Sequence, residues 1–168
     1  MRQMRESLII DGHNVIHRLK RYRRLQEGVR EKAIEKLIAD LVNLSGSGDL
    51  DIIVVFDGGE RPNETEIGGI KVVYSGSVSS ADSVIEKLVF KTSSERSVTV
   101  CTSDYAQQKV VWRKGTKRMT PRDLGEMMTD TFEENREVNT GKTRFRLEGR
   151  VSESTRKKLE DMRLGKTN

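Results

Sequence analysis

The sequence predicts a three-layer α/β fold, in which helices flank both faces of a central parallel sheet. Four short, almost entirely apolar segments end at polar turns, as buried strands do: Leu8–Ile10, Ile52–Phe56, Ile70–Tyr74 and Val98–Cys101. The apolar runs are continuous rather than alternating, which indicates strands that are covered on both faces. Segments with helical periodicity alternate with these strands, as the connections of a parallel sheet require.

The first two predicted helices follow from periodicity and capping residues. Apolar side chains recur at helical spacing from Arg30 to Leu44, and Gly46 is suited to end that helix. A second helix is expected to begin near Ser79 or Ser80, because Ser79-x-x-Asp82 resembles a capping box.

Two more helices and a loop complete the predicted order. One helix is expected from Asp104 to about Lys114. Another opens at Thr120-Pro121-x-Asp123, with the threonine as cap and the proline in the first turn. The polar residues 59–69 are predicted to form a loop between the second and third strands.

The length of 168 residues suits one domain with a single core. We expect this domain to span residues 1–138. Beyond Val138 the chain is polar and basic, with little apolar periodicity. Residues 139–168 are therefore predicted to form a basic, flexible C-terminal tail.

Positive charge is concentrated in two parts of the chain, which has a net charge of +5 and a pI near 9.4. One is the C-terminal tail, and the other is an acid-free run that contains Arg18, Arg21, Arg23 and Arg24. Such a surface attracts polyanions, so these arginines are predicted to contact the backbone of a nucleic acid. The alternative is that both stretches are solvated surface that aids solubility.

Several protein classes are excluded by composition. No stretch approaches the roughly 20 apolar residues that span a bilayer, and the polar start of the chain has no apolar signal core. We therefore expect a cytoplasmic location. Cys101 is the single cysteine, in a predicted strand interior, and the chain has two histidines. This is too little for a structural zinc site, so carboxylates must be the main ligands of any metal.

Acidic residues follow the predicted strands at one end of the sheet. Asp11, Asp57 and Asp104 come at or just beyond the ends of three strands, and Asp82 begins the helix after another. The carboxyl ends of parallel strands meet at one edge, where ligands bind. Taken singly, each aspartate is as well explained as a helix cap, a turn residue or a first-turn acid. Their coincidence at one edge favours a shared site.

Four carboxylates at close range repel one another unless a cation such as Mg²⁺ or Mn²⁺ neutralises them. Such ions lower the pKa of a bound water and stabilise charge on a phosphoryl oxygen. An acidic pocket within a basic protein is therefore the combination that a nuclease requires.

Five motifs in a fixed order carry a family resemblance: Asp11-Gly-His-Asn14, Val54-Val-Phe-Asp57-Gly, Val72-Val-Tyr-Ser75, Ala81-Asp82-Ser-Val-Ile-Glu86 and Thr102-Ser-Asp104. Over roughly residues 7–136 the sequence resembles the YacP-like NYN-domain proteins, within the wider group of PIN-like nucleases. The resemblance implies a PIN-like fold and metal-dependent endoribonuclease activity in RNA processing or mRNA decay. Association with the ribosome is part of this expectation.

The resemblance also implies roles for individual residues. Asp11, Asp82 and Asp104 are the expected catalytic and metal-binding acids, with Asp57 as a further metal ligand. Asn14 is expected to position a phosphate or a metal-bound water; the alternative is a bond to the turn backbone. His13 stands where the family more often has tyrosine.

Ser103 is a candidate to donate to a substrate phosphate, although a hydroxyl that stabilises the loop is an equal alternative. Two other functions fit parts of the sequence. One is an RNA- or ribosome-binding module with little catalytic activity. The other is a phosphatase or phosphotransfer enzyme for small substrates, which leaves the basic tail unexplained.

Overall fold

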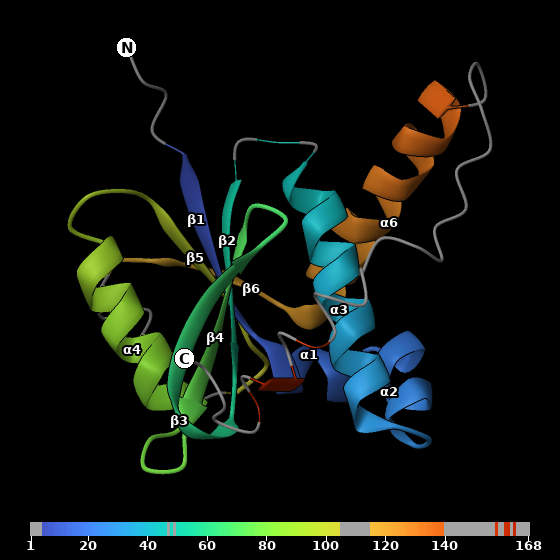
Figure 1. Cartoon of the computed structure of the whole chain (residues 1–168). Coiled ribbons are helices and arrows are strands. Elements are labelled where there is room, and N and C mark those ends of the chain that lie inside the picture. Colours follow the sequence, from blue (N-terminus) through green and yellow to red (C-terminus); the bar gives the residue numbers. More distant parts are fainter. Residues whose placement is uncertain are drawn as a thin grey trace.

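The computed structural model describes residues 5–46, 48, 50–104 and 115–139, together with Lys157, Glu160, Asp161 and Arg163. A six-stranded sheet with the order β3-β4-β2-β1-β5-β6 forms the centre of the molecule (Figure 1). Helices cover both faces of this sheet, so the predicted three-layer α/β fold is confirmed.

Strand β1 (Glu6–Asp11) occupies the middle of the sheet, parallel to β2 (Leu50–Phe56) on one side and β5 (Val98–Cys101) on the other. The side chains of Leu8, Ile9 and Ile10 are at most 1% exposed. Successive strand residues point to opposite faces, so burial of all three requires a layer on each side. This explains why the strand is a continuous apolar run.

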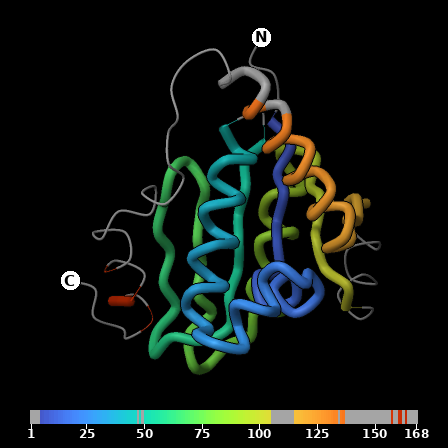
Figure 2. Tube along the Cα trace, turned by 90° about the vertical axis from the view of Figure 1, so that its right-hand side faces the viewer, coloured from blue at the N-terminus to red at the C-terminus, as the bar shows by residue number. Residues whose placement is uncertain are grey.

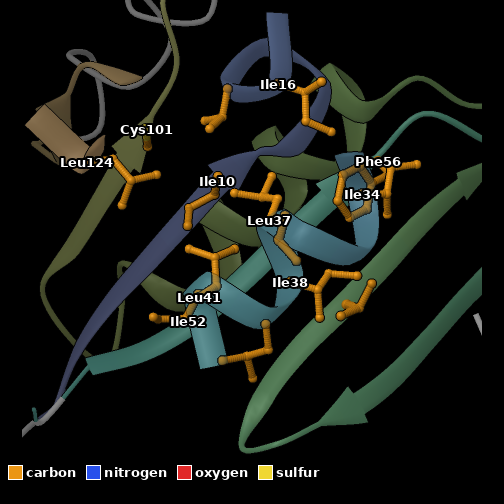
Figure 3. Packing of buried hydrophobic residues seen from close by; sticks show 14 of the residues in the cluster. Ile10, Ile16, Ile34, Leu37, Ile38, Leu41, Ile52, Phe56, Cys101 and Leu124 are labelled. Atoms are coloured by element: carbon orange, nitrogen blue, oxygen red, sulfur yellow. The ribbon is translucent and has the colours of Figure 1, made fainter. Parts of the chain in front are cut away.

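The two faces of the sheet carry different numbers of helices. Four helices pack on one face and share the larger hydrophobic core with it: α1 (Gly12–Arg18), α2 (Lys20–Gln26), α3 (Arg30–Ser45) and α6 (Pro121–Asn139). On the opposite face α4 (Ala81–Thr92) packs through Ala81, Ile85 and Val89 (Figure 2). Figure 3 shows the larger core, in which Leu37 of α3 and Leu124 of α6 meet side chains of the strands.

The predicted loop at residues 59–69 is wrong. Residues Gly58–Ile67 form strand β3, which pairs antiparallel with β4 (Ile70–Gly76), so the sheet is mixed rather than entirely parallel. Gly68 and Gly69 join the strands and have φ angles of +57° and +86°, the left-handed values that a two-residue hairpin turn of type I′ needs. An edge strand with few buried side chains lacks the apolar signal that marks the inner strands.

Three further elements are absent from the sequence prediction. Strand β6 (Lys117–Met119) pairs parallel with β5, and its three residues are too few to show a period. Helices α1 and α2 occupy the stretch that the sequence describes only as a turn and a basic run. Periodicity is weak in helices of seven residues each, because they span about two turns.

A buried polar network holds α2 against α3. The fully buried Tyr22 donates its hydroxyl to Asp40 Oδ2 at 2.7 Å, and Lys36 Nζ donates to Asp40 Oδ1 at 2.6 Å. Burial, with the carboxylate of Asp40 nearby, raises the pKa of Tyr22 above its usual range. The basic run is therefore anchored in the core by its one aromatic residue.

The predicted helix ends are largely confirmed. The backbone amide of Thr120 donates to Asp123 Oδ2 at 3.0 Å, and the amide of Asp123 donates to Thr120 Oγ1 at 3.2 Å. This reciprocal pair is a capping box with aspartate in place of the usual Glu or Gln. Helix α3 ends at Gly46 as expected, but α4 is capped by Ser80, which accepts from the amide of Ser83, rather than by Ser79.

Two predicted segments lie mainly outside the described residues. The helix expected from Asp104 to Lys114 falls on residues 105–114, and Asp104 itself is not helical. Most of the predicted tail is also outside the description. Arg163, which is described, forms an ion pair with Glu31 of α3 at 3.4 Å.

The turn from β1 into α1 lies directly against an aromatic ring. A Cβ atom on Gly12 would come within 2.2 Å of Phe56 Cε1, and Phe56 is fully buried. The ring cannot move aside without disturbing the core. Glycine is therefore required at this position by space rather than by its φ angle.

We expect Gly12→Ala to lower the free energy of unfolding by about 1–3 kcal/mol, because it overpacks the core. Gly28→Ala is the matched control, since its nearest neighbour would be Leu25 O at 3.7 Å, and its effect should stay within about 0.5 kcal/mol. Urea denaturation of both variants measures the difference. Equal stability of the two variants would contradict the tight packing at Gly12.

Candidate active site at the carboxyl edge of the sheet

The strand register brings four aspartates to one edge of the sheet. Asp11, at the end of β1, pairs with Val55 of β2, while Ile10 pairs with Cys101 of β5. Asp57 and Asp104 follow the ends of β2 and β5 by one and three residues, and Asp82 stands in the first turn of α4. The four aspartates therefore lie at the carboxyl edge of the sheet, where the sequence predicts them.

Asp11 is the most enclosed of the four acids, with 8% of its surface exposed. Its Oδ1 accepts the backbone amide of Asn14 at 3.2 Å and so caps α1. Burial raises the pKa of the neighbouring Cys101 thiol above its usual range, and the charge of Asp11 adds to this effect. Cys101 is fully buried, as predicted.

Asn14 ties the end of β1 to the segment after β5. Its Oδ1 accepts both the backbone amide and the hydroxyl of Ser103, each at 2.9 Å. Arg18 Nε donates to the same hydroxyl, also at 2.9 Å. Because a backbone amide can only donate, these bonds fix the orientation of the Asn14 side chain. They also hold Ser103, the neighbour of Asp104, beside the start of α1.

Asp57 connects the end of β2 to the start of α4. Its Oδ1 accepts the amide of Ala81 at 2.6 Å and lies 3.4 Å from Ser75 Oγ. This carboxylate therefore binds the first turn of α4 and holds the exposed Asp82 next to it. Asp57 thus supports the start of a helix that Ser80 caps, a structural role akin to the one that the sequence leaves open for it.

His13 bridges the two halves of the edge, a role that the sequence did not reveal. Its Nε2 lies 3.2 Å from the carbonyl oxygen of Asp57, and its ring meets Phe56 edge-on at 5.3 Å between centroids. Burial lowers the pKa of His13, with the charge of Arg30 acting in the same direction. A neutral ring with its proton on Nε2 can donate to Asp57. Nδ1 is buried and has no hydrogen-bond partner within the described part of the chain.

The acids share an edge without forming a closed metal cage. Within the described ranges, which omit residues 105–114, no group of three or more His, Cys, Asp or Glu side chains is arranged to hold a metal ion. Asp82 and Asp104 are exposed. Mg²⁺ retains several waters and commonly binds through one or two carboxylates and a substrate phosphate. The hard oxygen ligands at this edge therefore fit such an ion, although they do not enclose it.

A family profile matches nearly the whole chain. The YacP-like NYN domain aligns with residues 8–164, a range that includes much of the predicted tail. The chain belongs to the YacP-like NYN domain family. The match confirms the family that the five sequence motifs predict.

Individual proteins similar to this NYN domain come from Bacillus subtilis. The uncharacterized protein YacP of strain 168 is 28% identical over 124 residues, which cover 71% of this chain and 72% of YacP. Two crystal structures of Rae1 (YacP), one of them a mutant, give TM-scores of 0.69 and 0.68 at 24% identity. They cover 92% of this chain and 98% and 92% of theirs, and they show that the fold is shared.

The predicted substrate-binding arginines of this NYN domain differ in their surroundings. Arg23 and Arg24 are exposed on α2. Arg21 donates from Nη2 to the carbonyl oxygen of Gly125 at 3.0 Å, and its guanidinium lies 5.3 Å from the centre of the Tyr22 ring. Arg21 therefore joins α2 to α6.

No helix in the described residues is both long and apolar enough to cross a membrane.

We expect Asn14→Ala to speed hydrogen exchange at the backbone amide of Ser103 by about 2- to 13-fold, the equivalent of about 0.5–1.5 kcal/mol for one lost bond. Ser103→Ala is the control, because it removes the hydroxyl but leaves the bond from the Ser103 amide to Asn14 Oδ1. Its exchange rate should stay near that of the natural protein. Unchanged exchange in Asn14→Ala would show that the side chain does not hold this segment.

Proposed function

We propose that this NYN domain is a metal-dependent endoribonuclease that hydrolyses RNA phosphodiester bonds during RNA processing or decay in the cytoplasm. The main support is that four aspartates, three at or just beyond strand ends and one in the first turn of α4, lie at one edge of the sheet. Two hydrogen-bonded links hold this edge together, Asn14 with Ser103 and Asp57 with Ala81. The exposed Arg23 and Arg24 of α2 come soon after Asp11 in the sequence, and the net charge of +5 favours binding of a polyanion.

Asp11, Asp82 and Asp104 would hold the Mg²⁺ or Mn²⁺ ion, and Asp57 would contribute as a further ligand or by positioning Asp82. Such an ion lowers the pKa of a bound water and offsets charge on the phosphoryl oxygens. With Oδ1 of Asn14 committed to Ser103, we assign its Nδ2 group to donate to a substrate phosphate oxygen.

Arg18 supplies positive charge beside these groups. Its Nε is held by Ser103, so its guanidinium has a defined anchor while remaining exposed. A guanidinium that is fixed at one nitrogen loses less freedom when it binds a phosphate. We assign Arg18, with Ser103, to hold the backbone of the substrate near the acids.

A second candidate is an RNA- or ribosome-binding module with little catalytic activity. The observation that favours it is the lack, among the described residues, of three acids arranged to hold a metal. The two functions predict different effects of replacing the aspartates with uncharged residues. In an enzyme these substitutions abolish RNA cleavage. In a binding module they leave RNA binding as tight as before or make it tighter, because repulsion of the phosphates falls.

We expect the double variant Asp11→Asn, Asp82→Asn to lose about 100-fold or more of Mn²⁺-dependent RNA cleavage, because metal binding supplies several kcal/mol of charge stabilisation. Asparagine caps helices as well as aspartate does, so α1 should keep its cap. Time courses of single-stranded RNA cleavage with purified protein provide the measurement.

The matched control neutralises two acids that pair with cations away from this edge, Asp51→Asn with Glu64→Gln. It should cleave at nearly the natural rate. Equal cleavage by the natural protein and the active-edge variant would refute the proposed enzyme. Binding without cleavage by the natural protein would favour the second candidate.

We expect Arg23→Gln with Arg24→Gln to weaken RNA binding and to reduce its salt slope by about 0.7 for each lost phosphate contact. Binding is measured by titration at several salt concentrations, with chelator present to prevent cleavage. The control is Arg5→Gln with Arg96→Gln, which removes the same charge from residues that pair with Asp51. If both pairs change the slope equally, α2 has no special role in binding.

A further inference from the structure

An open groove runs along the exposed side of α4, next to the acidic edge. Its volume is about 890 Å³, and its lining includes Asp57, Ser83, Lys87 and Phe90. Asp57 is also the residue whose carboxylate accepts the first amide of α4, at Ala81, in the proposed active site. The groove is therefore continuous with that site.

Phe90 stands between this groove and a smaller one of about 620 Å³, because it lines both. The residue is 70% exposed. Among the described residues it is the one aromatic member of the exposed large apolar set, and Val78, at 95% exposure, lines the same larger groove. Single exposed apolar residues are ordinary, but two that flank one polar groove need a common explanation.

The position of Phe90 on the helix relates it to the acids. Asp82, Glu86 and Phe90 are spaced by four residues each, so they form one stripe along α4. At 1.5 Å per residue, Phe90 lies about 12 Å along the helix from Asp82. A strand with one phosphate at the acidic edge can place a nearby base at Phe90.

The charge of the groove indicates which part of a nucleic acid faces it. Among its described lining residues, Asp57 and Glu86 are acidic and Lys87 is the one cation. A formal charge of −1 does not attract a phosphate backbone. A base is uncharged and can stack on an aromatic ring, and the serine hydroxyls that line the groove can bond to the edge of a base. A protein partner fits less well, because the apolar area here is confined to two side chains.

We propose that Phe90 and the groove along α4 form a base-binding subsite for single-stranded RNA, in which an unpaired base stacks on the Phe90 ring. This inference rests on the RNA substrate of the proposed function. It assigns α4 to the bases and α2 to the phosphates, so one strand is held in two chemically different ways. Bases in a duplex are already stacked on one another, so the subsite selects unpaired RNA.

The test compares Phe90→Ala, Phe90→Leu and Phe90→Tyr in full-length protein with chelator present. The ligand is a single-stranded RNA that carries 2-aminopurine, whose fluorescence falls when it stacks on an aromatic ring. We expect alanine and leucine to weaken binding at least about fivefold and to abolish the quenching, while tyrosine preserves both. The salt slope should not change, in contrast with the loss of arginines from α2, and binding of duplex RNA should be unaffected.

Full binding by Phe90→Leu would overturn the proposal, because leucine keeps apolar contact but has no ring to stack on. Equal binding by all three variants would also overturn it. If the natural protein cleaves RNA and the variants bind and cleave equally well, the subsite is refuted and the nuclease stands. If the natural protein binds no RNA, both proposals fall.

Discussion

The contact between the turn after β1 and the ring of Phe56 is the constraint on which the acidic edge depends. With no side chain at Gly12, the chain turns into α1 directly above β2. That turn directs His13 toward the end of β2 and Asn14 toward the segment after β5. A bulkier residue would lift α1 from the sheet and so move His13 and Asn14 away from these contacts.

The edge combines fixed and exposed groups. Asp11 and Asp57 each accept a backbone amide at a helix start, so their positions are set by the fold itself. Asp57, Asp82 and Asp104 are exposed. Carboxylates that the fold positions yet leaves open to solvent would suit a metal that retains part of its hydration.

The features that local sequence could predict are those with local causes. The inner strands appear as apolar runs, because both faces of the sheet are covered, and the box of Thr120 and Asp123 is visible within four residues. The convergence of the acids follows from the geometry of parallel strands.

By contrast, the bond from Asn14 to Ser103 joins residues 89 positions apart, and nothing in either neighbourhood specifies it. Tyr22 lies hidden in a basic run because its partner, Asp40, is a polar residue of another helix. Strand β3 was not predicted for a related reason. It is held by backbone pairing with β4 and has no buried side chains, so its sequence lacks an apolar pattern.

That hairpin has a consequence for the outer boundary of the sheet. Strand β3 is the edge strand on the side of β4, and its register is irregular between Gly58 and Asn63. Pro62 lacks an amide hydrogen, and the exposed side chains of Glu60, Arg61, Glu64 and Glu66 surround it. Irregular, charged and proline-containing edges resist the addition of a strand from another molecule. The same polar residues that conceal β3 in the sequence thus guard the folded protein against edge-to-edge aggregation.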